Sequence, residues 1–162
     1  MFTKAFLLTA ALCTTALFMP IAASADKAMD TDALKGKYLI EITGCNDCHT
    51  SGYAQSGGLV PEAKWLLGDE LGFRGPWGTT YPNNLRTYVS EISEGDWVDL
   101  ARTLKARPPM PWWALNAMTD GDLLALYKYI KSLALVASTV PAYVPPGGVP
   151  KTPYIQWPVP PK

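Results

Sequence analysis

The segment Cys45-Asn46-Asp47-Cys48-His49 constrains the fold of this 162-residue chain more than any other feature. Its C-x-x-C-H pattern is typical of covalent haem attachment, in which each thiol binds one vinyl group of the porphyrin. The neutral imidazole of the histidine is then a suitable axial ligand for the iron. The sequence therefore predicts one haem c per chain. Cys45 and Cys48 are expected to bind it covalently, and His49 is expected to be the proximal iron ligand.

The amino-acid composition argues against the other common roles of two closely spaced thiols, such as zinc binding or redox chemistry. His49 is the only histidine, and Cys13 is the only further cysteine. A structural zinc site needs four Cys or His ligands, usually as two spaced pairs, and no second pair exists. A thioredoxin-like dithiol would follow a strand of a βαβ unit, whereas no strand-like segment precedes Cys45. A redox dithiol or a simple disulfide stays open as the alternative.

The first 25 residues have the pattern of a cleaved secretory signal peptide. Lys4 gives a positive start, residues 5–18 are mostly apolar, and Ala23-Ser24-Ala25 fits the A-x-A cleavage site. The apolar stretch is shorter than the ~20 residues of a membrane span. We therefore expect export to the periplasm and loss of Cys13 with the signal peptide.

Residues 26–162 have a length that suits one domain with one core. Without Lys4, 13 basic side chains stand against 14 acidic ones, so the formal charge before any cofactor is −1. No basic face for nucleic acid is evident, and no second apolar run suggests a membrane segment. We therefore expect neither nucleic acid nor an integral membrane segment in the mature protein.

Apolar periodicity predicts three helices, at about residues 31–44, 94–106 and 120–133. Ser93 and Thr119 are suitable caps for the second and third helices. The expected buried faces are Leu34, Tyr38 and Ile42; Trp97, Leu100, Ala101 and Leu104; and Leu123, Leu126, Tyr127, Ile130 and Leu133. Residues 50–92 have no sustained period, with a short helical piece expected near residues 61–67.

The sixth iron ligand must be a residue other than histidine if it comes from this chain. Thioether sulfur is the natural choice, since His/Met ligation occurs in cytochromes c. Met29, Met110 and Met118 remain after the signal peptide. Met110 lies among prolines in residues 107–111, and such a stiff loop can present one side chain. Met110 is the predicted ligand, and Met118 is the alternative.

These motifs resemble those of monohaem c-type cytochromes of the class I, bacterial periplasmic kind, over residues 31–133. The resemblance rests on residues 45–49 and on Met110-Pro111, which precedes a Thr119-Asp120 cap at the family's usual interval. It implies an all-α, cytochrome c-like domain of about three to five helices around one haem, with long loops. It also implies that Gly36 lets the last helix cross the first closely, against Leu126, Tyr129 and Ile130.

Two further expectations come from the same resemblance. Residues 75–85 are similar to the loop before the ligand in haem subunits of periplasmic dehydrogenases, and this makes Trp77, Asn84 and Arg86 candidates to contact the haem propionates. In addition, Pro61 has the spacing at which related cytochromes offer a backbone carbonyl to the free ring nitrogen of the proximal histidine.

The chain departs from a minimal cytochrome c in its C-terminal extension. Eight of the 22 residues from Pro141 to Lys162 are proline, and aromatic residues lie between them. Proline-rich composition favours extended chain. We therefore divide the mature chain into a domain of residues 26–140 and a tail of residues 141–162, which is either a strap on the domain or a docking arm.

The expected function is single-electron transfer between larger redox proteins, the electron donor and the electron acceptor, with a six-coordinate iron and no enzymatic activity. One alternative is a cytochrome subunit held tightly by a dehydrogenase or oxidase. A less favoured alternative is a five-coordinate haem enzyme or a protein that binds gas ligands.

Overall fold

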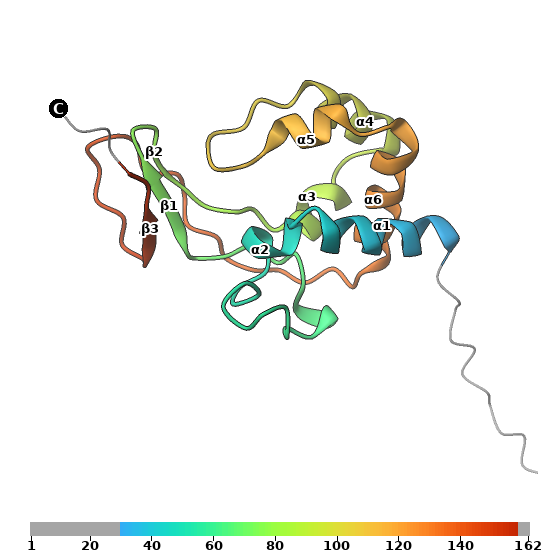
Figure 1. The fold of residues 1–162 in the computed structure, drawn as a ribbon, viewed down its shortest axis with the longest axis horizontal. Coiled ribbons are helices and arrows are strands. Elements are labelled where there is room, and N and C mark those ends of the chain that lie inside the picture. The colour runs from blue at the N-terminus through green and yellow to red at the C-terminus, as the bar shows by residue number, and fades with distance from the viewer. Residues whose placement is uncertain (1–29, 159–162) are drawn as a thin grey trace, which may run out of the picture.

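The computed structural model describes residues 30–158, so the predicted signal peptide, Cys13 and Met29 lie outside the described residues. The described part begins with a helical segment, continues through a small β-hairpin, and returns to helices before an extended C-terminal segment (Figure 1). In chain order the elements are α1 (Thr31–Ile42), α2 (Cys45–His49), the 3₁₀ helix η1 (Glu62–Lys64), β1 (Gly72–Gly75), β2 (Gly78–Thr80), α3 (Leu85–Ser90), α4 (Glu94–Thr103), α5 (Trp112–Ala117), α6 (Asp120–Ser132) and β3 (Tyr154–Gln156).

Helices α1 and α6 cross at close range, and Gly36 makes the crossing possible. A Cβ atom at Gly36 would overlap the carbonyl oxygen of Ala125 and would lie 2.7 Å from Cβ of Tyr129. Only a residue without a side chain fits there, so the predicted role of Gly36 and its contact with Tyr129 are confirmed. Leu126 and Ile130 are buried in the same helix.

The predicted buried face of α1 is wrong. Leu34, Tyr38 and Ile42 are each more than half exposed, whereas Ala33, Gly36 and Ile40 are buried. The reason is the close crossing, because the helix turns its smallest residues toward α6 and leaves its larger ones on the outside. Bulk at this face would force the two backbones apart.

Both predicted caps of the later helices are confirmed. The hydroxyl of Ser93 accepts a hydrogen bond from the amide of Asp96, and Thr119 and Asp122 form a reciprocal capping box. Helix α4 ends at Thr103, earlier than predicted. Its buried Trp97 donates a hydrogen bond of 2.7 Å to the carbonyl of Leu123 and so ties α4 to α6.

The prediction of an all-α fold is wrong, because a three-stranded mixed sheet with the order β2-β1-β3 lies at one end of the molecule (Figure 1). Strand β1 pairs with β2 in antiparallel and with β3 in parallel orientation. The strands have only three or four residues, too short for a clear alternation of apolar and polar positions. The third strand also comes from the proline-rich tail, where no strand was expected.

The C-terminal segment returns from α6 to this sheet and lies along it (Figure 1). Val144 and Thr79 exchange two backbone hydrogen bonds, of 2.7 and 3.0 Å, before β3 pairs with β1. We refer to residues 140–158 as the C-terminal strap. Within residues 30–158, no helix has the length and apolar character that a membrane crossing requires.

Candidate haem site

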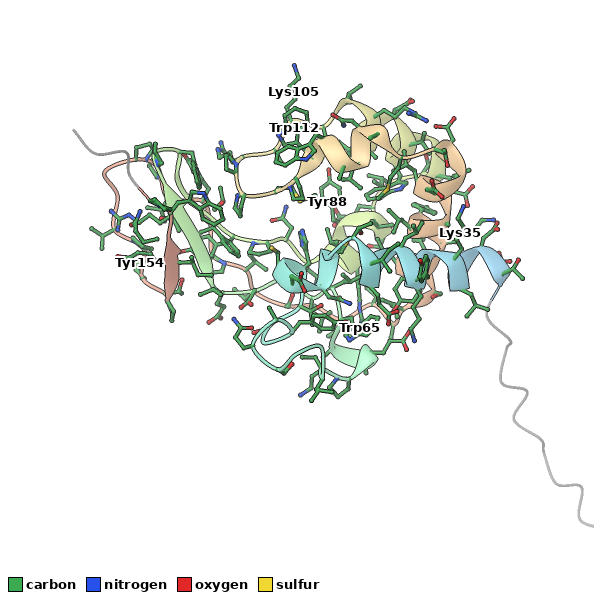
Figure 2. All side chains as sticks on the ribbon, viewed as in Figure 1. Lys35, Trp65, Tyr88, Lys105, Trp112 and Tyr154 are labelled. Atoms are coloured by element: carbon green, nitrogen blue, oxygen red, sulfur yellow. The ribbon has the colours of Figure 1, made fainter. Side chains whose placement is uncertain are left out.

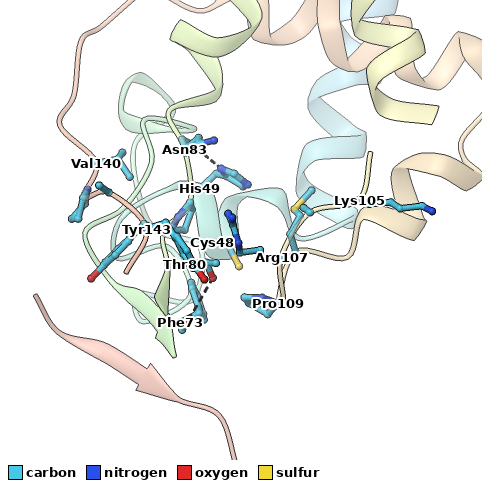
Figure 3. Close-up of a pocket in the computed structure, with 16 residues that line it drawn as sticks. Cys48, His49, Phe73, Thr80, Asn83, Lys105, Arg107, Pro109, Val140 and Tyr143 are labelled. Carbon is cyan, nitrogen blue, oxygen red and sulfur yellow. Dashed lines mark hydrogen bonds between the residues drawn. The ribbon is translucent and has the colours of Figure 1, made fainter. Parts of the chain in front are cut away.

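Two adjoining cavities, with volumes of about 730 and 220 Å³, lie beside α2 and the loop before α5. Residues of the strap line the larger cavity, and helices line most of the smaller one. Cys48, His49, Asn83, Ala106 and Met110 line both cavities, so the two share a wall. The larger cavity is shown in Figure 3, where Cys48, His49, Arg107 and Tyr143 face it. The larger volume is in the range of ordinary small-molecule and cofactor sites, roughly 300–1,000 Å³.

The two cysteines are presented by α2, a helix that begins directly after Gly44. Gly44 has a φ of 72°, a conformation that favours glycine and lets the chain leave α1 and start a new helix at once. Cys48 lines both cavities and Cys45 lines the smaller one, and the two thiols are free. Both sulfur atoms are therefore available to one ligand in this space.

The electrostatics around the two cysteines disfavour a reactive dithiol. Burial raises the pKa of the Cys45 thiol, and burial together with the nearby Asp47 raises the pKa of the Cys48 thiol. Redox-active and nucleophilic cysteines have lowered pKa values, because the thiolate is the reactive form. The raised pKa values therefore give no support to a thiol pair poised for disulfide exchange.

His49 is fixed by one hydrogen bond to the backbone. Its Nδ1 atom lies 2.8 Å from the carbonyl oxygen of Asn83 (Figure 3). Since a carbonyl only accepts, Nδ1 carries the proton, and Nε2 keeps a free lone pair. Burial lowers the pKa of His49 although the Asn83 carbonyl opposes this, so the imidazole is neutral. The carbonyl follows Pro82 and not Pro61, whose own carbonyl accepts from Lys64.

A neutral imidazole with an oriented ring is the state that a metal ligand requires, and a backbone acceptor at the other ring nitrogen is its usual support. The proximal-ligand prediction for His49 therefore fits the observed geometry. The chain distance between Asn83 and the C-x-x-C-H segment explains why the sequence alone pointed to the wrong carbonyl.

The walls of the smaller cavity are mostly apolar. Helices α1, α4, α5 and α6 all contribute, and Figure 2 shows Tyr88 on the side of α3 that faces α5. An apolar, water-poor space suits a porphyrin, whose faces are large and apolar. Its apolar lining residues are Ile40, Leu85, Tyr88, Trp97, Leu100, Leu104, Ala114, Leu115, Leu126 and Ile130.

The two candidate methionines differ in their position. Met110 lines both cavities, as His49 does, whereas Met118 lines the smaller cavity only. Met110 comes from the loop between α4 and α5, so it approaches from a segment far from α2 in the sequence. The predicted ligand Met110 therefore lines the same two cavities as His49, whereas Met118 shares only the smaller cavity with it.

Trp77, Asn84 and Arg86 line neither cavity, and their polar atoms have other partners. The indole of Trp77 donates to the carbonyl of Phe73. Asn84 caps α3 and donates to the carbonyl of Val136. The buried guanidinium of Arg86 donates to three carbonyl oxygens, those of Trp65, Ala134 and Glu62. All three side chains connect backbone segments away from the cavities, and this disfavours the predicted contact with haem propionates.

Sequence reasoning missed Lys105, Arg107 and Tyr143, which line the larger cavity. No carboxylate is among the described residues that line it, so its charged side chains are both cations. The position of Lys105 and Arg107 just before Met110 was an available signal, whereas nothing in the proline-rich tail marked Tyr143. Cationic side chains are suited to bind carboxylates, so this cavity offers positive charge to an anionic ligand, which the buried Arg86 does not.

Comparisons of the chain with protein-family models, with curated proteins and with solved structures found no match. Among residues 30–158, no cluster of three or more His, Cys, Asp or Glu side chains is arranged to hold a bare metal ion.

Proposed function

We propose that this protein is an exported c-type haem protein that carries single electrons, with His49 and Met110 as axial iron ligands. One observation carries the proposal: Cys48, His49 and Met110 line the same two adjoining cavities, and Cys45 lines the smaller of them. These residues come from two distant segments, and their donor atoms are the thiols, imidazole and thioether that a haem c uses.

Each part of the site has a distinct task under this proposal. When bound, haem supplies an iron centre that gains and loses one electron. Cys45 and Cys48 hold the cofactor through two thioether bonds, each formed by adding S–H across a vinyl double bond. His49 offers Nε2 while Asn83 fixes its ring. Met110 would provide a second ligand, and the apolar residues of the smaller cavity would exclude water.

The arrangement favours electron transfer over catalysis, because His49 and Met110 would both be available to hold the iron. With His49 and Met110 both holding the iron, the protein would offer no free position to a substrate. Lys105 would balance the charge of a propionate at the larger cavity. The donor and the acceptor would be redox proteins in the same exported compartment.

Covalent attachment provides the test of this function. The full chain would be produced in a bacterial host with haem attachment machinery, and the haem that stays with the polypeptide after denaturing electrophoresis would be measured. The wild-type chain should retain one haem, and a variant with both Cys45→Ala and Cys48→Ala should retain none. A folded, exported wild-type chain without covalent haem would contradict the proposal. Redox titration of the haem-loaded protein should then follow a one-electron curve.

A further inference from the structure

The loop that carries Met110 is held by the C-terminal strap through one stacked pair. The guanidinium carbon of Arg107 lies 3.9 Å from the centre of the Tyr143 ring. Arg107 precedes Met110 by three residues, and Tyr143 belongs to the strap. No salt bridge engages Arg107 within residues 30–158, so the ring is its close charge-stabilising partner. An arginine over an aromatic face is attracted by the ring quadrupole.

Tyr143 is itself fixed to the β-hairpin. Its hydroxyl donates a hydrogen bond of 2.7 Å to the carbonyl of Trp77, and its neighbour Val144 pairs with Thr79. The hairpin also holds the Met110 loop directly, because the hydroxyl of Thr80 donates a hydrogen bond of 2.8 Å to the carbonyl of Pro108. The hairpin, the strap and the loop therefore form one connected wall of the larger cavity (Figure 3).

We propose that Tyr143 is a positioning residue for the sixth ligand, and that the strap keeps Met110 at the iron by holding Arg107. This inference rests on the proposed function, since it assigns a role in the same site. A loop whose backbone is ordered in advance loses little entropy when its side chain binds, so the thioether competes better with water and external ligands. The strap would then disfavour exogenous ligands at the iron by holding the loop that carries Met110.

The chain contains a matched control for this proposal. Tyr154 of β3 also belongs to the strap and also lies under an arginine, with the Arg74 guanidinium carbon 5.3 Å from the ring centre. Tyr154 and Arg74 line neither cavity, and Figure 2 shows Tyr154 at the sheet end of the molecule. A general loosening of the strap would therefore affect both tyrosines, whereas a specific effect on Met110 requires Tyr143.

Cyanide binding to the haem-loaded ferric protein measures how often Met110 leaves the iron. Tyr143→Ala should raise the cyanide association rate by about 3- to 10-fold, the range expected for loss of one partly exposed cation–π contact. It should also weaken the near-infrared absorption band of Met-ligated ferric haem. Tyr143→Phe keeps the ring and should restore the rate to within about 2-fold of wild type, and Tyr154→Ala should leave it unchanged.

Arg107→Gln provides a second route, because this exposed side chain can be replaced without disturbing the core. It should raise the rate as Tyr143→Ala does, and the double variant should add little to either single change, as expected for two partners in one contact. Equal rates in Tyr143→Ala, Arg107→Gln and wild type would overturn the positioning role. So would an equal rise in Tyr154→Ala.

The proposed function and this inference fail in different ways. A wild-type protein without covalent haem, or without the band of Met-ligated iron, overturns both. A wild-type protein that has the haem and the band, but whose cyanide rate is indifferent to Tyr143 and Arg107, overturns only the positioning role.

Discussion

The Nδ1 atom of His49 lies 2.8 Å from the carbonyl oxygen of Asn83, and this contact joins the C-x-x-C-H helix to the segment that starts α3. Asn84, the next residue, holds that segment in place. Its side chain accepts from the amides of Arg86 and Thr87, and it donates to Val136 and Ser138. The orientation of His49 therefore depends on bonds made well beyond the cavity.

Replacing Asn84 should loosen the support of His49. Asn84→Ala removes the cap of α3 and the bonds to Val136 and Ser138, so the segment that carries the Asn83 carbonyl is held less firmly. The Nδ1 proton of His49 should then exchange with solvent faster, by a factor on the order of ten. Proton NMR of the reduced, haem-loaded protein measures this exchange. Ser93→Ala is the matched control, because it costs the cap of α4, typically about 1 kcal/mol, at a site away from His49. Equal exchange in the two variants would contradict the dependence.

The crossing of α1 and α6 should tolerate no side chain at Gly36. Gly36→Ala would place a methyl group against the carbonyl of Ala125 and the Cβ of Tyr129. Overpacking of this kind typically lowers the free energy of unfolding by about 1–3 kcal/mol, which urea denaturation would measure.

Gly95→Ala is the matched control for Gly36→Ala. Gly95 lies in α4, and the nearest atom to an added Cβ there is 4.0 Å away. Since alanine favours helix, that change should leave the protein as stable or up to about 1 kcal/mol more stable. Equal losses at the two positions would contradict the close crossing.

Arg86 should matter for stability and not for the haem. Arg86→Ala leaves three carbonyl oxygens, those of Trp65, Ala134 and Glu62, without their donor, which should lower the free energy of unfolding by about 3 kcal/mol or more. Arg102 pairs with Asp120 on the surface, and Arg102→Ala should cost at most about 1 kcal/mol. The absorption spectrum of the haem-loaded protein should be the same in both variants. A spectral change in Arg86→Ala with unchanged stability would restore the propionate role.

Acid should remove a contribution that Glu62 makes to stability. Partial burial raises the pKa of this carboxyl group, but hydrogen bonds from Lys37 and Tyr129 outweigh burial and hold the pKa below 4.5. The ionised group therefore stabilises the fold above pH 4.5, and that stability is lost as the pH falls through the lowered pKa.

Glu62→Gln should show this dependence directly. Its difference in unfolding free energy from wild type should be largest near neutral pH and should shrink below pH 4.5. Urea denaturation at a series of pH values gives the difference. A constant difference between pH 3 and pH 7, the range chosen around the usual Glu pKa of about 4.3, would contradict the assignment.

Local sequence signals predicted those parts of the fold that depend on neighbouring residues. The caps at Ser93 and Thr119 form within one helical turn, so their residue types suffice. Gly36 was also recognisable, because a glycine inside a helix needs a reason such as a close crossing. The exposed face of α1 could not be predicted in this way. Which face packs depends on how closely α6 approaches, and not on which side chains are larger.

Long-range pairing accounts for most of what the sequence did not reveal. Strand β3 forms because the tail returns to β1, and three residues carry too little pattern to announce this. The same return brings Tyr143 to the larger cavity. The contact of Asn83 with His49 is also long-range, because 34 residues separate the two in the sequence. By contrast, the candidate ligands Cys45, Cys48 and His49 lie in one short motif, so their chemistry could be predicted from residue types and spacing alone.

The near-infrared spectrum of the ferric, haem-loaded protein tests the central claim most directly, because a methionine–iron bond gives a characteristic weak band there. We expect the band in the wild-type protein and in Met118→Ala, and its loss in Met110→Ala together with rapid binding of CO to the ferrous form. A band that persists in Met110→Ala would contradict the proposed site, and a wild-type protein without the band that binds CO rapidly would contradict the closed electron carrier.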